Sequence, residues 1–306
     1  MRDLKPIAVT CGDPAGVGPE VIAHWLADNP QHHNDICIIG PSHWTRQHRV
    51  SNSVQAVSVG DKEYIIHPGE PDTAGAAIAR DALYEAATGI IAGKYRAVVT
   101  GPIAKSWMQQ VGFDYPGHTE FFADQWGGEP TMAFTGKYMR IALVTWHCPL
   151  NRVGKEITFA GLERAVRNLH FLLTSEGKPE PRIAVCGVNP HAGEGGMLGN
   201  DEVSRLNPWL NDLRPEFPGL SECLPGDTVF WRHLKGDFDG VIAMYHDQGL
   251  GPLKTVEFDS AVNITLGLPH VRTSPDHGTG FSIAGKNLAT TTSFDAAFKM
   301  ALRLSA

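Results

Sequence analysis

Three stretches of sequence decide the fold: RIALVTWHCP (140–149), RIAVCGVNPHAG (182–193) and DGVIAMYHDQ (239–248). Each begins as an apolar, β-branched run, which is typical of a buried strand of a parallel sheet. Each run is followed by a histidine: His147, His191 and His246. Ligands of open α/β sheets bind outside the carboxyl ends of the strands, so we expect three imidazoles at one sheet edge.

Three imidazoles with an open fourth position are the ligand set of a catalytic divalent metal. Neutral nitrogen ligands favour zinc, or another borderline ion such as cobalt, over magnesium, which prefers oxygen. Asp247 follows His246 directly and is a carboxylate that can orient the imidazole. The alternative for any single one of the 14 histidines is an ordinary loop histidine. Three of them at three strand ends favour the metal site.

The rest of the chain alternates in the same way. Further strand-like runs near 7–11, 36–40, 97–100, 132–135 and 261–266 are separated by helix-like stretches at 72–93, 156–177 and 293–304. Asp72 and Ser293 are candidate N-caps. This alternation predicts a doubly wound α/β architecture. Because no Pro/Gly/Ser-rich linker divides the chain, we expect a discontinuous first lobe, residues 1–115 plus 250–306, and a second lobe, residues 116–249.

Composition narrows the classes of function. The 306 residues are 42% apolar and 19% charged with a formal net charge of −7, which argues against a nucleic-acid or anionic-membrane partner. The first residues lack a signal peptide and no run is long enough to span a membrane, so we expect a cytoplasmic protein. The five cysteines are odd in number and lack a CxxC pair, which indicates reduced thiols.

Seven motifs occur in an order that resembles one enzyme family. They are GDPAGVGPE (12–20), VVTGPIAK (98–105), GHTEFF (117–122), NPHAGEGG (189–196), AMYHDQG (243–249), VNITLGLP (262–269) and RTSPDHGT (272–279). Alone, GDPAGVGPE is weak as a phosphate cradle, because a plain strand-to-helix turn explains its glycines equally well. Together, the seven motifs resemble those of the 4-hydroxythreonine-4-phosphate dehydrogenase family.

The resemblance implies an isocitrate/isopropylmalate-dehydrogenase-like fold of two α/β/α lobes with the active-site cleft between them. It implies a homodimer whose active sites are shared, with the metal held by His147 and His191 of one subunit and His246 of the other. The implied reaction is oxidation of 4-phosphohydroxy-L-threonine by NAD or NADP to a 3-keto acid. That acid decarboxylates to 3-amino-2-oxopropyl phosphate, in pyridoxal phosphate biosynthesis.

Family motifs also suggest the remaining site residues. The implied substrate-binding residues are His118, Thr119, Lys254, Asn263 and Arg272. The loop HGTGFSIAGKN (277–287), beginning with His277, Gly278 and Thr279, resembles the segment that holds the adenosine of the dinucleotide. Asp227 and Asp247 are candidate partners of the metal ligands, although Asp227 fits a solvated helix cap equally well.

The charges of Lys254 and Arg272 suit substrate binding on physical grounds as well. An acidic chain must concentrate cations such as Lys254 and Arg272 to hold a small phosphorylated substrate. Lys254 and Asp247 are the candidate catalytic side chains. Lys254 suits proton transfer, and equally suits binding of a phosphate or carboxylate.

Several positions depart from the family pattern and leave the substrate open. Met197-Leu198-Gly199 follows NPHAGEGG where the family often has HMG, and EFDS (257–260) precedes VNITLG in place of a glycine-rich stretch. A sister activity is oxidation of D-threonate or D-erythronate 4-phosphate. The same histidines would also suit a metal-dependent hydrolase or aldolase without nicotinamide, or a noncatalytic metal-binding scaffold. The metal, with magnesium also considered, and the choice of NAD or NADP stay open.

Overall fold

The computed structural model describes residues 5–49 and 53–306. The chain divides into two compact units, Met1–Gly128 with Leu268–Ala306, and Glu129–Gly267. The crossings therefore lie near 128 and 267, whereas the sequence suggested 116 and 250. The first crossing comes later because Phe121 and Phe122 of α5 (His118–Trp126) are fully buried in the core of the first unit. The second comes later because residues 262–266 pair with residues 131–135 of the second unit.

The first unit is built on parallel strands in the order β3-β2-β1-β4-β11. Their bounds are β1 Ile7–Thr10, β2 Ile36–Gly40, β3 Gln55–Ser58, β4 Ala97–Thr100 and β11 Val271–Pro275. The α-helices of this unit are α1 Gly18–Asp28, α2 Ser42–His48, α3 Thr73–Ile91, α4 Lys105–Gln110, α5 and α11 Thr292–Leu304. A 3-10 turn, η1 Pro30–Asp35, links α1 to β2.

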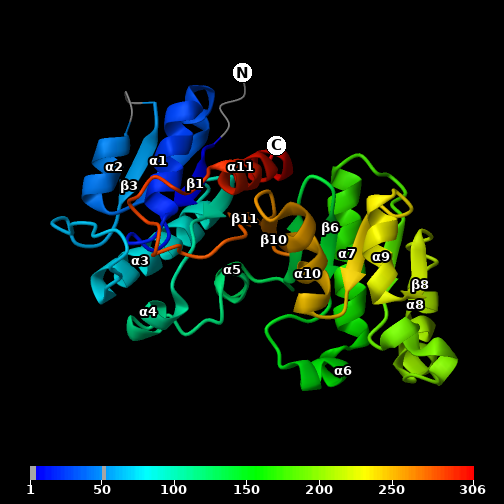
Figure 1. Cartoon of the computed structure of the whole chain (residues 1–306). Coiled ribbons are helices and arrows are strands. Elements are labelled where there is room, and N and C mark those ends of the chain that lie inside the picture. Colours follow the sequence, from blue (N-terminus) through cyan, green and yellow to red (C-terminus); the bar gives the residue numbers. More distant parts are fainter. Residues whose placement is uncertain (1–4, 50–52) are drawn as a thin grey trace. The chain divides into compact units, whose positions relative to one another are not determined.

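Two apolar layers enclose this sheet. On one side, α3 and α5 pack against Ala8, Cys37 and Val98 of the strands. The C-terminal helix α11 packs against α1, where Trp25 meets the rings of Phe294 and Phe298 (Figure 1). Both ends of the described chain thus belong to one unit.

The second unit has strands in the order β10-β5-β6-β9-β7-β8. Their bounds are β5 Thr131–Thr135, β6 Arg140–Leu143, β7 Ile183–Cys186, β8 Leu220–Leu224, β9 Gly240–Ala243 and β10 Val262–Leu266. Strands β6, β9, β7 and β8 are mutually parallel, whereas β5 is antiparallel to both β6 and β10. The buried runs that carry the three histidines are therefore adjacent parallel strands.

Helices cover both faces of these strands. They are α6 Val153–Glu156, α7 Phe159–Ser175, α8 Asn207–Leu213, α9 Gly226–Leu234 and α10 His246–Glu257, with the short turns η3 Leu150–Arg152, η4 Pro190–Gly196 and η5 Glu202–Leu206. Residues of α9 and α10 share one apolar cluster with β6, β7 and β9. Helix α7 packs on β6 and β9, where a Cβ on Gly240 would lie 3.0 Å from Leu173.

Helix termini agree with the sequence in part. Asp72 caps α3, since its Oδ1 accepts a hydrogen bond from Gly75 N at 2.6 Å. The cap predicted at Ser293 is wrong, because α11 already begins at Thr292 and the buried Ser293 hydroxyl accepts from Asp276 N at 3.3 Å instead. Helix α7 begins at Phe159 with Thr158 as its cap, three residues later than predicted.

All five cysteines are free thiols. Cys11, Cys37, Cys186 and Cys223 are buried and Cys148 is half-buried. Across residues 5–49 and 53–306, no helix combines the length and the apolar character that crossing a membrane requires.

Candidate metal and substrate sites

The three predicted histidines lie at the carboxyl ends of three neighbouring parallel strands. His147 follows β6, His246 begins α10 directly after β9, and His191 lies in the loop after β7. The sheet order β6-β9-β7 makes them neighbours along one edge. The three histidines thus lie in the second unit at the strand ends that the sequence predicted.

These histidines line two pockets. His147 and His246 line one of about 410 Å³, and their ring centroids are 6.0 Å apart. His191 and Asp227 line the other, of about 400 Å³. Tyr245 lines both pockets. Asp227 lies in the first turn of α9, at a helix N-terminus, and lines the same pocket as His191.

Asp247 orients the imidazole of His246. Its Oδ1 is 2.7 Å from Nδ1 of His246. A neutral imidazole that donates from Nδ1 keeps its lone pair on Nε2, which is the tautomer that binds a metal. The donor chemistry at His246 therefore fits a divalent ion.

His147 and His191 both have strained backbones. Their φ angles are 23° and 51°, in the left-handed region that non-glycine residues rarely adopt. His191 begins a run of left-handed residues that extends through Gly195. Each non-glycine residue in this conformation costs of order 1–2 kcal/mol, and such strain concentrates at functional sites.

The loop that carries His191 is held by a buried acid, Glu202. The side chain is fully buried, and Oε1 accepts from the backbone N–H of Val188 and of Asn189, both at 2.8 Å. Oε2 accepts from Nδ2 of Asn189 at 3.0 Å. Sequence reasoning missed Glu202, since EVSRL carries no pattern that distinguishes a buried acid from a solvated helical one.

A single chain does not complete a metal cluster. Within the described residues, the His, Cys, Asp and Glu side chains include no group of three or more that could hold an ion. The imidazoles share an edge, yet His191 lies in a different pocket from His147 and His246. An ion bound by all three histidines needs either a rearrangement or a histidine from another chain.

The first unit gathers residues that suit an anion. Arg272 on β11 is 2% exposed and donates to Thr100 Oγ1 from Nη2 at 2.8 Å, and to Ser274 Oγ at 2.9 Å. His118 begins α5, and its Nε2 is buried with no hydrogen-bond partner among the residues that the structure places. The neighbouring Thr119 is 2% exposed.

Burial lowers the pKa of two side chains in this cluster. It lowers the pKa of Arg272 to about 9, and Glu120 offsets this only in part. Burial, with the positive charges of Arg272 and Lys105, holds the pKa of His118 well below its usual range. Arg272 and Lys105 thus place positive charge around the imidazole of His118, which these surroundings keep neutral. Lys105, which follows the GPIA turn after β4, is a neighbour that the sequence did not single out.

The other predicted substrate residues lie in the second unit. Lys254 is half-buried on α10, with Nζ 5.9 Å from the centroid of the Phe258 ring. Asn263 is half-buried on β10, opposite Phe134 of β5.

The predicted dinucleotide loop follows β11 in the first unit. Thr279 O accepts from Val17 N at 2.8 Å, and a Cβ on Gly16 would lie 2.7 Å from the same oxygen. The glycines of GDPAGVGPE thus allow close packing of this loop. His277 is half-buried, with Nδ1 2.9 Å from the carbonyl of the exposed Gly278.

Solved structures first give the class of fold. A β-decarboxylating dehydrogenase from Thermococcus kodakarensis matches 98% of this chain and 84% of its own with a TM-score of 0.52 at 15% identity. The protein is thus an α/β protein with the predicted isocitrate/isopropylmalate-dehydrogenase-like fold.

Closer matches give the family. The family described as pyridoxal phosphate biosynthetic protein PdxA matches residues 20–301, and the chain belongs to it. A 4-hydroxythreonine-4-phosphate dehydrogenase from Beijerinckia indica is 39% identical over 98% of this chain and 95% of its own. The resemblance to this family is therefore confirmed.

Two solved structures extend the comparison. The 4-hydroxythreonine-4-phosphate dehydrogenase from Klebsiella pneumoniae covers 99% of this chain and 100% of its own, with a TM-score of 0.84 and 31% identity. A terephthalate 1,2-cis-dihydrodiol dehydrogenase from Burkholderia xenovorans covers 98% of both chains, with a TM-score of 0.70 and 26% identity.

Proposed function

We propose that this protein is an NAD(P)-dependent dehydrogenase that oxidises a secondary alcohol of a small phosphorylated substrate, 4-phosphohydroxy-L-threonine in the first instance. Membership of the PdxA family over residues 20–301 is the observation that carries the proposal. The activities in the names of the relatives from Beijerinckia indica and Klebsiella pneumoniae support it. Decarboxylation of the resulting β-keto acid to 3-amino-2-oxopropyl phosphate is part of the proposal.

Chain residues have distinct proposed roles. His147, His191 and His246 would hold a divalent ion, zinc or cobalt before magnesium, and Asp247 would keep His246 in the tautomer with a free Nε2. When bound, such an ion supplies Lewis acidity, which lowers the pKa of a coordinated hydroxyl. Asp227, in the pocket of His191, is a candidate partner of that imidazole.

Because one chain leaves His191 apart from the other two, we propose a homodimer whose metal sites are shared. His147 and His191 of one subunit would act with His246 of the partner subunit. This division follows from the family resemblance alone. Within one chain His147 shares a pocket with His246 and not with His191, so the pockets support the need for a second chain and not this particular division.

In the first unit, the cluster of Arg272, His118 and Thr119 would bind a negatively charged group of the substrate. Arg272 and His118 are buried, and Arg272 and Lys105 surround His118 with positive charge, which favours a phosphate or carboxylate. Thr119 adds a hydroxyl. Lys254 and Asn263 complete the proposed substrate set, with Lys254 as proton-transfer group or anion ligand. The segment from His277 through Gly278 and Thr279 would bind the dinucleotide, which accepts the hydride when bound.

The test is a substrate panel followed by absorbance of the reduced nicotinamide. The purified protein is supplied with zinc or cobalt, then with NAD or NADP. The panel is 4-phosphohydroxy-L-threonine, D-threonate 4-phosphate, D-erythronate 4-phosphate and a cis-dihydrodiol. We expect turnover of the first at the highest kcat/KM. Turnover of another substrate at tenfold higher kcat/KM would reassign the substrate. Substrate cleavage without any nicotinamide would point to a hydrolase or aldolase.

A further inference from the structure

Glu202 lies outside the proposed ligand set, yet it is bonded to the segment that leads to His191. We propose that Glu202 is a positioning residue that fixes the backbone of His191 and thereby sets the metal affinity of the site. This inference rests on the proposed function, since it presumes that His191 binds the ion. The hydrogen bonds that Glu202 accepts go to residues before His191, so its action on the imidazole would be through the backbone.

The contacts of Glu202 show how this would work. Its Oε1 accepts from the N–H groups of Val188 and Asn189, the second and third residues after β7. Its Oε2 accepts from the side chain of Asn189, two residues before His191. One carboxylate therefore holds the chain at the point where it leaves the sheet for the left-handed turn.

The turn is also packed closely onto this carboxylate. A Cβ on Gly193 would lie 2.6 Å from Glu202 Oε2, and a Cβ on Gly187 would lie 3.0 Å from Oε1. The carboxylate thus fills the space between the strand end and the tip of the loop. Without it, a loop with left-handed φ at His191, Ala192 and Glu194 would lose the partner that favours this conformation.

Helix geometry fixes Glu202 in turn. Glu202 begins the π-helical turn η5, and Arg205 on that turn donates to the carbonyls of Ile157 and Gly154. Arg205 also bonds Asp201 Oδ1 at 2.8 Å. The turn that carries Glu202 is therefore anchored, through Arg205, to a second segment of the unit.

A purely structural role is the alternative, because loss of any buried carboxylate can destabilise a fold. Glu176 provides the matched control. It lies at the opposite end of β6, in the same unit, and its carboxylate accepts from Nε of Arg140 at 2.6 Å. Glu176→Gln should lower stability without affecting the metal site.

The experiment titrates metal-free protein with Co²⁺ and records affinity and visible spectrum, which needs no turnover. We expect Glu202→Ala to weaken Co²⁺ binding ten- to a hundredfold and to alter the spectrum. Glu202→Gln, which keeps the shape and one acceptor oxygen, should fall between this variant and the parent. Glu176→Gln should bind within twofold of the parent. Native affinity and spectrum in folded Glu202→Ala would overturn the inference.

Amide hydrogen exchange separates this inference from the proposed function. In Glu202→Ala, or in Glu202→Gln if the alanine variant does not fold, the amides of Val188 and Asn189 should exchange faster than in Glu176→Gln. If the parent protein binds no Co²⁺, the metal site itself is refuted. Amide hydrogen exchange at Val188 and Asn189 then still tests whether Glu202 stabilises the loop. Unchanged exchange at these two amides would refute the role of Glu202 whatever the metal result.

Discussion

Arg272 shows how a single residue connects burial to substrate choice. A guanidinium that is 2% exposed has lost its hydration, and its bonds to Thr100 and Ser274 are to neutral hydroxyls. Burial lowers the pKa of the guanidinium, because the charged form is poorly solvated there. A substrate phosphate or carboxylate would stabilise the charged form.

Replacing Arg272 with alanine should lower kcat/KM roughly ten- to a hundredfold, because a charge-assisted hydrogen bond contributes about 1.5–3 kcal/mol. Dinucleotide affinity should stay within about twofold. Steady-state kinetics and equilibrium binding of NAD measure the two quantities. Arg182→Ala, at a half-exposed surface arginine, is the matched control. Weakened NAD binding with unaltered substrate kinetics would place Arg272 in the other pocket.

At the residue scale, the sequence was informative about chemistry and less so about surroundings. Histidines after apolar runs were recognisable because a strand end has a pattern. Glu202 had no such signal, since its burial depends on the loop folding back over it. Lys105 was also overlooked, because its effect on His118 depends on α4 and α5 lying together in space.

At the element scale, apolar strands were predictable and polar or edge strands were not. The three strands that carry the histidines are buried and β-branched, so their pattern was clear. The edge strand β3 is largely exposed, and β11 has the sequence VRTSP, in which a buried arginine and hydroxyls replace apolar residues. Such strands form because they pair with neighbouring strands. A local sequence pattern carries no information about that pairing.

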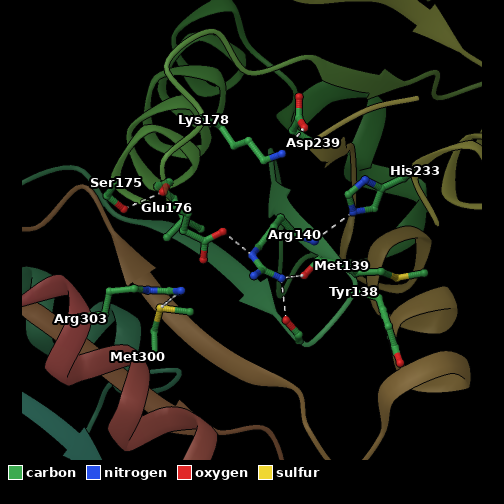
Figure 2. Close-up of polar contacts among 12 residues, drawn as sticks. Tyr138, Met139, Arg140, Ser175, Glu176, Lys178, His233, Asp239, Met300 and Arg303 are labelled. Atoms are coloured by element: carbon green, nitrogen blue, oxygen red, sulfur yellow. Dashed lines mark hydrogen bonds and ion pairs between the residues drawn. The ribbon is translucent and has the colours of Figure 1, made fainter. Parts of the chain in front are cut away.

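The turn between β5 and β6 contains a polar network that makes stability depend on pH. Nε2 of the buried His233 accepts from Arg140 N at 3.2 Å (Figure 2). Nδ1, which lies 2.9 Å from the Phe238 carbonyl, must therefore donate to it. Figure 2 also shows the Arg140 side chain bonded to Glu176 and to the Met139 carbonyl. This arrangement requires a neutral imidazole, and burial lowers the pKa of His233.

Because the folded-state pKa lies below the unfolded value, the unfolded chain takes up the proton first as pH falls. The free energy of unfolding should therefore be retained above about pH 6.5 and decrease progressively below it. Urea denaturation at pH 7.5 and 5.5 tests this. His233→Asn should lose less stability between the two pH values than the parent, whereas His67→Asn, at an exposed loop position, should behave like the parent. Equal losses in His233→Asn and the parent would contradict the assignment.

At the scale of the whole molecule, the discontinuous first unit follows from the sequence because no linker interrupts the alternation of strands and helices. The crossing points were harder to predict. The first depends on which core receives α5, and Phe121 and Phe122 decide this through tertiary packing. The second lies after β10, which pairs with β5 of the second unit. The proposed sharing of the metal site is likewise beyond local patterns, because a single chain has its three histidines in two pockets.

Subunit mixing tests the shared site. His147→Ala and His246→Ala should each be nearly inactive, while a refolded or exchanged mixture should recover about a quarter of the parent activity. In a mixed dimer both substitutions can fall in one site and leave the other intact. Mixing two preparations of His147→Ala is the control. No recovery after subunit exchange has been demonstrated would mean that His147 and His246 of one site come from the same chain.

The central claim is that His147, His191 and His246 bind one divalent ion, and metal content tests it most directly. Parent protein and His191→Ala are saturated with zinc, dialysed together and measured by elemental analysis. Surface His67→Ala serves as the control. The account predicts one zinc per chain in the parent and in the control, and a small fraction of that in His191→Ala. Full zinc occupancy in folded His191→Ala would contradict it.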